Sequence, residues 1–124
     1  MIKSIRNIKF SIGGYSQGES FYTLENDLLS YWHNGFAGME EPFDDVNRKK
    51  LTDSDQAKLM ALFNKLDFLS WEREYQMLAC DGTQWEIMVT YNGNLKKKVF
   101  GSNAYPEGFD KIERLFKRLL RTTI

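Results

Sequence analysis

The sequence has little of several residue types on which common functional sites depend. Its 124 residues include one cysteine and one histidine. With Cys80 alone, a disulfide within the chain is excluded and nothing indicates an oxidising compartment. With His33 alone, a site built from several histidine ligands is excluded. No apolar run approaches the ~20 residues of a membrane span, and Lys3, Arg6 and Lys9 interrupt the N-terminal segment where a signal peptide needs a continuous apolar core.

An excess of charge of one sign is also missing. The chain has 17 Lys and Arg against 17 Asp and Glu, so its formal net charge at pH 7 is zero. No overall positive field therefore draws the protein toward nucleic acid or anionic lipid. We expect a complete chain that forms a single domain, residues 1–124, in the cytoplasm, with no nucleic-acid or membrane partner.

Aromatic residues, by contrast, are abundant. Nine Phe, six Tyr and three Trp make up 15% of the chain. Most of them must lie in the core, because aromatic burial dominates the energetics of small domains. Any that remain exposed would suit a partner, since Trp and Tyr are favoured at recognition surfaces.

Alternating apolar residues predict strands in the first quarter of the chain. Ile8, Phe10 and Ile12 alternate with polar residues, which is the two-residue period of a half-buried strand. The runs SFYTL and LLSYW follow, with the turn-prone Asn26 and Asp27 between them. We therefore expect three antiparallel strands here.

Residues 34–50, NGFAGMEEPFDDVNRKK, show no period and form the longest irregular stretch. Glu40, Glu41, Asp44 and Asp45 are the kind of oxygen ligands that hard cations prefer, and paired carboxylates can do acid–base chemistry. The run lacks the Asp-x-Asp-x-Asp-Gly spacing of a calcium loop. A solvated acidic loop is the simpler interpretation, and we assign no metal or cofactor site.

Two segments have the period of amphipathic helices. The first follows Thr52, a good N-cap residue, with Asp53 and Asp55 in its first turn. The second runs from Pro106 to Leu120, because proline is tolerated in a first helical turn. Their expected apolar stripes are Leu59, Leu62, Phe63 and Leu66 in the first, and Phe109, Ile112, Phe116 and Leu119 in the second.

The run QWEIMVTY, followed by Asn92-Gly93, predicts a hairpin before the second helix. A two-residue loop would place lysines on the apolar face. We therefore expect a three-residue loop, Tyr91 to Gly93, that pairs Val89 with Leu95 and Trp85 with Val99.

Lys96, Lys97 and Lys98 follow in the second strand of this hairpin. Consecutive strand residues point to alternate faces, so these lysines cannot form one basic patch with the closing helix. We interpret them as protection of an edge strand against aggregation.

This order of elements indicates the fold class. The segment DFLSWEREYQMLAC, between the first helix and the hairpin, is ambiguous between a short helix and a strand. We predict an α+β domain: an antiparallel sheet of about five strands, in the order βββ-α-ββ-α, with two amphipathic helices packed on one face.

Three further positions are candidate sites with simpler alternatives. VFGSNAYPEGF joins a strand to a helix, the setting of many anion sites, but Gly101 and Gly108 do not have P-loop spacing and we favour a structural turn. His33 could act as a general base beside a carboxylate, although a lone histidine at a strand end is usually a surface residue. Cys80 is best interpreted as a buried small residue. We assign no catalytic residue.

The stretches WEREYQMLACDGTQWEIMVTYNG and GSNAYP, read with the closing amphipathic helix, give the chain a resemblance. It resembles small bacterial domains classed as families of unknown function. In these, a glycine-bearing strand pair precedes a helix, and a D-G-x-x-W strand, a hairpin and a terminal helix follow. The resemblance implies an α+β fold and a bacterial origin, and it brings no activity or catalytic residues.

Three functional hypotheses follow. The first is a non-catalytic binding or protein-interaction domain, favoured by the aromatic content and the lack of catalytic motifs. The second is a small hydrolase-like enzyme using carboxylates with His33. The third is a homodimeric structural or assembly protein joined along a sheet edge.

Overall fold

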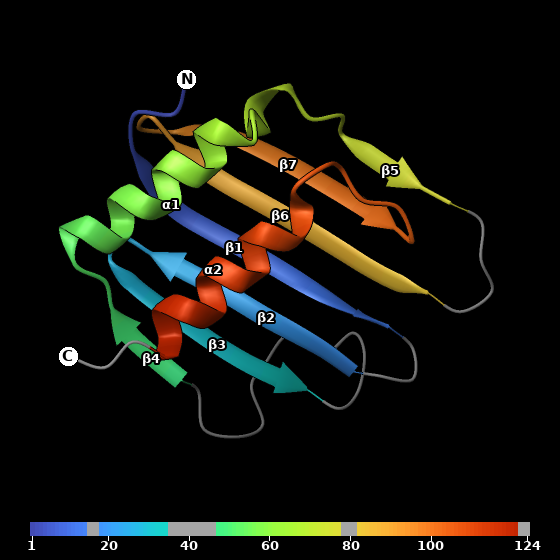
Figure 1. The fold of residues 1–124 in the computed structure, drawn as a ribbon, viewed down its shortest axis with the longest axis horizontal. Helices are drawn as coiled ribbons and strands as arrows, with labels where there is room; N and C mark the ends of the chain where they lie inside the picture. The colour runs from blue at the N-terminus through green and yellow to red at the C-terminus, as the bar shows by residue number, and fades with distance from the viewer. Residues whose placement is uncertain (15–17, 35–46, 78–81, 122–124) are drawn as a thin grey trace.

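The computed structural model describes residues 1–14, 18–34, 47–77 and 82–121. These form two layers, a twisted sheet and two helices that both cross one of its faces (Figure 1). The sheet has seven strands in the order β4-β3-β2-β1-β6-β7-β5. In chain order the elements are β1 Ile5–Gly14, β2 Gly18–Glu25, β3 Leu28–Asn34, β4 Asn47–Lys50, α1 Asp53–Lys65, the 3-10 turn η1 Phe68–Ser70, β5 Glu74–Gln76, β6 Thr83–Tyr91, β7 Leu95–Ser102 and α2 Phe109–Arg121.

The predicted sheet of about five antiparallel strands, and with it the order βββ-α-ββ-α, is wrong. Two short strands were missed, β4 within the predicted acidic loop and β5 within the ambiguous segment. The sheet is mixed, because β5 runs parallel to β7. Both missed strands have four residues or fewer, too short for a hydrophobic period to show. Their strand conformation comes from pairing with β3 and β7.

The three strands expected at the start of the chain are confirmed. β1 pairs with β2, and β2 with β3, both antiparallel. On its other side β1 pairs with β6, so the first strand of the chain lies near the middle of the sheet. Ile8 and Phe10 of β1 are accordingly buried beneath the helices.

The predicted pairing of the β6–β7 hairpin is wrong by two residues. Val89 lies opposite Lys97 and Trp85 opposite Gly101, so the three-residue loop is Asn92 to Asn94. Asn92 sets this register. It adopts a left-handed conformation (φ 46°), and its side-chain oxygen accepts hydrogen bonds from the backbone N–H groups of Lys3 (2.7 Å) and Ser4 (3.1 Å). A shift of two residues leaves every side chain on its predicted face.

Both helices bury the stripes that position them. Thr52 caps α1 in a reciprocal capping box with Asp55, which confirms the predicted N-cap. Of the four residues predicted for the first stripe, Leu59 and Phe63 are fully buried in α1, whereas Leu62 and Leu66 are only partly buried and Leu66 lies just after the helix. The four predicted residues of the second stripe, Phe109, Ile112, Phe116 and Leu119, are all buried in α2.

Trp85 closes the core near the start of α2. Its side chain is 3% exposed, its ring centroid lies 4.4 Å from that of Phe109, and its indole Nε1 donates to the carbonyl of Ala104 at 2.9 Å. Gly101, directly opposite, makes room for the indole, because a Cβ there would lie 2.5 Å from ring atoms. Within the described ranges, neither helix is long and apolar enough to cross a membrane.

Candidate functional site

A cleft of about 760 Å³ lies between α2 and the ends of β1, β2, β3 and β6. These strand ends extend past α2, which leaves the sheet uncovered by a helix there (Figure 1). Two glycines line the cleft, and Gly13 allows β1 to approach β2 closely, because a Cβ there would clash with the backbone of Gly18. The remaining lining is apolar around Ile12, Tyr105, Pro106 and Phe109, and polar around Ser20, His33, Thr83, Asp110, Glu113, Arg114 and Lys117.

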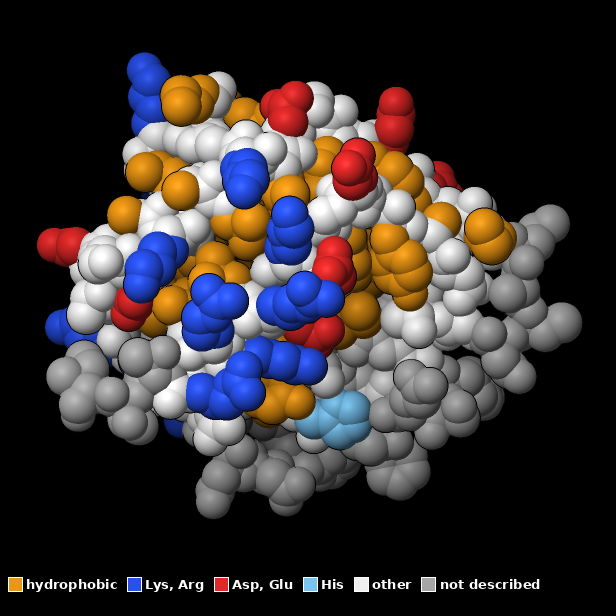
Figure 2. Space-filling model, viewed as in Figure 1, with side chains coloured by type: hydrophobic (Ala, Val, Ile, Leu, Met, Phe, Trp, Pro, Cys, Tyr) orange, Lys and Arg blue, Asp and Glu red, His pale blue; other side chains and the backbone are white. Residues whose placement is uncertain are grey.

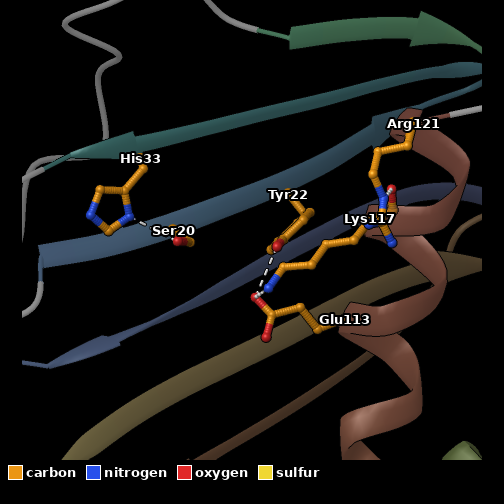
Figure 3. Close-up of polar contacts among 6 residues, drawn as sticks. All are labelled: Ser20, Tyr22, His33, Glu113, Lys117 and Arg121. Carbon is orange, nitrogen blue, oxygen red and sulfur yellow. Dashed lines mark hydrogen bonds and ion pairs between the residues drawn. The ribbon is translucent and has the colours of Figure 1, made fainter.

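The sequence-predicted candidate His33 lies in this cleft and is paired with a serine. His33 and Ser20 are directly opposite on β3 and β2, and their side chains both point to the helix-bearing face. The His33 Nδ1 lies 2.9 Å from the Ser20 Oγ, a hydrogen bond in which either group can be the donor (Figure 3). In the described part of the chain, this is the only hydrogen bond of the ring, so the expected carboxylate partner is not in contact.

A second polar group fixes a carboxylate in the cleft wall. The buried Tyr22 hydroxyl donates to Glu113 at 2.8 Å, and Lys117 lies 3.8 Å from the same carboxylate oxygen (Figure 3). Burial raises the pKa of Tyr22 well above its usual range, and the hydrogen bond and negative charge of Glu113 raise it further. Tyr22 therefore stays protonated and acts as a permanent donor that orients Glu113.

The outer wall carries a more exposed ion pair. Arg114 lies 3.0 Å from Asp110, one helical turn earlier, and both side chains are mostly exposed. Such exposed i,i+4 pairs contribute only a few tenths of a kcal/mol to stability. Their side chains can therefore exchange partners with an incoming ligand at little cost.

The apolar end of the cleft presents one exposed aromatic ring. Tyr105 is 46% exposed and packs on Phe109 (ring centroids 5.0 Å apart) and on Trp85 (6.2 Å). It is the only exposed aromatic side chain in the described residues. The aromatic richness of the sequence is thus mostly a property of the core, and the described surface carries no cluster of exposed aromatic rings.

The strand-to-helix loop that resembled an anion site has its polar groups engaged in structure. Asn103 adopts a left-handed conformation (φ 58°), and its side-chain oxygen and backbone N–H bond the backbone of Thr83, each at 2.9 Å. Phe109 and Lys111 donate their N–H groups to the carbonyls of Pro106 and Gly108. These bonds favour the structural interpretation of the loop.

As predicted, the side chains of the lysine run in β7 do not form one surface. Lys97 donates to the carbonyl of Trp71 at 2.7 Å on the helix side, and Lys98 pairs with Glu86 at 3.4 Å on the other. β7 is not the outermost strand, so the edge-strand interpretation holds only for part of it. In the described residues β5 pairs with Phe100 to Ser102 alone, and the three lysines lie in the part of β7 that β5 does not cover.

Two other predictions fall outside the described residues. These are Cys80 and the acidic run Glu40, Glu41, Asp44 and Asp45. In the ranges that the structure does describe, no group of three or more His, Cys, Asp or Glu side chains could hold a metal ion.

Ser20, Tyr22, Thr83 and Glu113 were not singled out from the sequence. Hydrophobic periodicity predicts the strands and the helix, but it does not predict the cleft that their ends enclose. No protein-family model matches the chain, and a search of the curated proteins finds no match either. The likeness to bacterial domains of unknown function therefore stays a prediction.

Proposed function

We propose that this chain is a non-catalytic binding domain of the bacterial cytoplasm that holds a segment of a partner protein in the cleft beside α2. The observation that carries the proposal is the cleft itself. Its volume of about 760 Å³ lies within the range of sites that bury a ligand. It places an exposed aromatic ring at one end and oriented charges at the other. That combination of an apolar anchor with polar specificity is typical of recognition sites.

The partners of the charged groups favour binding over catalysis. Glu113 is engaged by Tyr22 and Lys117, and Asp110 by Arg114. The histidine base of a hydrolase is itself oriented by a third group, most often a carboxylate. In the described residues, neither carboxylate of the cleft contacts His33.

The experiment is a selection of displayed random peptides on the purified protein, followed by affinity measurements with the recovered peptides. We expect enriched peptides to bind the wild type and to lose about tenfold or more in affinity with Tyr105→Ala, because an aromatic anchor carries much of the energy of small interfaces. Leu95→Ala is the matched control, since Leu95 is similarly exposed but lies at the β6–β7 hairpin, away from the cleft lining. Failure to enrich any peptide, or equal binding by Tyr105→Ala, would contradict the proposal.

A second candidate is a small hydrolase, and one observation favours it. Ser20 and His33 are hydrogen-bonded inside the cleft. In such an enzyme the Ser20 oxygen would attack an ester carbonyl, His33 would take the hydroxyl proton and return it to the leaving alcohol, and water would release the acyl group.

A fluorophosphonate probe separates the two candidates. For a binding domain we expect no more labelling of the wild type than of Ser20→Ala. Covalent labelling at Ser20 that disappears in His33→Ala would establish the hydrolase instead.

A further inference from the structure

The solvent-facing side of α2 is basic over most of its length. Its exposed cationic residues are Lys111, Arg114, Lys117, Arg118 and Arg121, which we call the α2 basic face. The two acidic residues of the helix, Asp110 and Glu113, lie near its start, and none follows Glu113 up to Arg121. Figure 2 shows Lys and Arg side chains gathered over the part of this surface that α2 crosses, with acidic side chains among them.

The basic face is continuous with the cleft. Arg114 and Lys117 belong to both, since they line the cleft and lie on the exposed side of α2. Each is paired with an acidic residue of the same helix, at 3.0 Å for Arg114 and 3.8 Å for Lys117. A guanidinium has five N–H donors and an ammonium three, so both keep donors for a second anion.

The rest of the chain is acidic. Helix α2 carries these five cations together with Asp110 and Glu113, which leaves 12 Lys and Arg against 15 Asp and Glu in the remainder. The neutral protein is therefore polarised, with positive charge concentrated along one helix. At physiological salt the field of these charges is screened beyond about 8 Å, so it favours only ligands that directly contact the helix.

We propose that the segment bound in the cleft is acidic and carries an apolar or aromatic residue. Its anchor contacts Tyr105 and Phe109, and its carboxylates follow α2 from Arg114 toward Arg121. This inference rests on the proposed function and adds the chemical class of the partner. From Arg114 to Arg121 the helix offers about 10 Å, which matches about three extended residues.

A nucleic acid or an anionic membrane fits this surface less well. Both extend well beyond the length of α2, so they would also meet the net negative remainder of the protein. Asp110 and Glu113 also interrupt the basic face beside the cleft, where a row of phosphates would pass. A short acidic segment can place its few carboxylates beyond these two residues.

The test classifies the peptides from the displayed library by charge and then measures one of them. We expect enriched peptides of about 12 residues with net negative charge and at least one aromatic residue. By fluorescence anisotropy, the best of them should bind Arg114→Gln/Lys117→Gln about tenfold more weakly than wild type. Lys9→Gln/Lys96→Gln is the matched control, with the same charge removed from exposed residues of the opposite sheet face, and it should bind within about twofold. Raising NaCl from about 50 to about 300 mM should weaken wild-type binding several-fold.

Each contrary result of this experiment bears on a different part of the proposal. Enriched peptides that depend on Tyr105 but are neutral or basic would overturn the acidic partner and leave the binding cleft standing. A complete lack of enrichment would remove the proposed function itself. A (dT)12 oligonucleotide or phosphatidylserine vesicles that bind more tightly than the acidic peptide, and lose binding with Arg114→Gln/Lys117→Gln, would replace the acidic segment as the ligand.

Discussion

Contacts of single side chains hold the wall of the cleft in place. Glu113 is only partly exposed, so its charge needs partners, and it has them in the Tyr22 hydroxyl and the Lys117 ammonium. Tyr22 in turn lies in an aromatic stack, with its ring centroid 5.5 Å from Phe10 and 5.4 Å from Phe116. The wall of the cleft is therefore continuous with the core, because the hydroxyl that holds its carboxylate belongs to a ring of this stack.

Trp85→Ala should strongly destabilise the protein. The substitution removes a buried indole, its packing on Phe109 and its hydrogen bond to Ala104. We expect the free energy of unfolding, measured in urea, to fall by about 3–5 kcal/mol, where a typical domain has about 5–15 kcal/mol in total. Leu95→Ala, at an exposed position, is the control. An unfolding free energy within about 0.5 kcal/mol of wild type would contradict the buried position of Trp85.

Tyr22 should make stability fall at high pH. Its folded pKa is raised above the unfolded value of 10.0, so the folded state retains the phenolic proton where the unfolded state releases it. Its contribution is therefore fully present below pH 10 and is lost as the pH rises above 10. We expect the wild type to lose stability between about pH 10 and 12, and Tyr22→Phe to lose less over the same interval, measured by urea unfolding at each pH. Equal slopes for the two proteins would show that Tyr22 does not titrate in this way.

At the scale of elements, helix ends and strand ends place the functional groups. α2 begins at Phe109, immediately after the loop that Asn103 ties to Thr83 at the start of β6. α1 is fixed at its start by the capping box and at its end by Trp71, whose indole N–H donates to the carbonyl of Leu66 at 3.0 Å. Both helices are thus held at defined points over the sheet, and α2 in particular is held where it forms one wall of the cleft.

Thr52→Ala tests the cap of α1. The Thr52 hydroxyl accepts from the N–H of Asp55 at 3.1 Å, and the Thr52 N–H donates to the Asp55 carboxylate at 3.3 Å. Removing the Thr52 hydroxyl should lower the free energy of unfolding by about 1 kcal/mol, measured by thermal or urea unfolding. Thr52→Ser should retain most of it, and the exposed Ser54→Ala should have little effect. An equal effect of Thr52→Ala and Ser54→Ala would argue against the cap.

The whole molecule is an open sheet with two short edge strands and helices on one face (Figure 1). The edges bear on the hypothesis of a homodimer joined along the sheet. β4 carries Arg48, Lys49 and Lys50 in four residues, and β5 has only three residues. Like charges placed directly opposite each other destabilise strand pairing, and a three-residue edge offers few hydrogen bonds.

We therefore expect a monomer. Light scattering after size exclusion at about 100 μM protein should give a mass near the 14.6 kDa of one chain. A dimer that survives high salt would contradict this expectation. A dimer that forms only at high salt would point to β4, because screening removes the repulsion between its basic side chains.

The sequence by itself determined what local periodicity can encode. Residues close together in the sequence account for four features: the stripe of α2, the cap of α1, the first three strands and the apolar face of β6. The face on which Trp85 lies was predictable even though its pairing was not, because a register error of two residues leaves the alternation of faces intact.

Only the tertiary structure decided the edge strands, the hairpin register and the cleft. β4 and β5 become strands by pairing with neighbours, and the hairpin register depends on Asn92 binding the N-terminal segment, 88 and 89 positions away in the chain. In the cleft, Ser20 meets His33 across 13 positions and Tyr22 meets Glu113 across 91. A local pattern reports which side of an element is apolar. It cannot report which elements become neighbours, since that depends on how the whole chain buries its apolar surface at the least cost in conformational entropy.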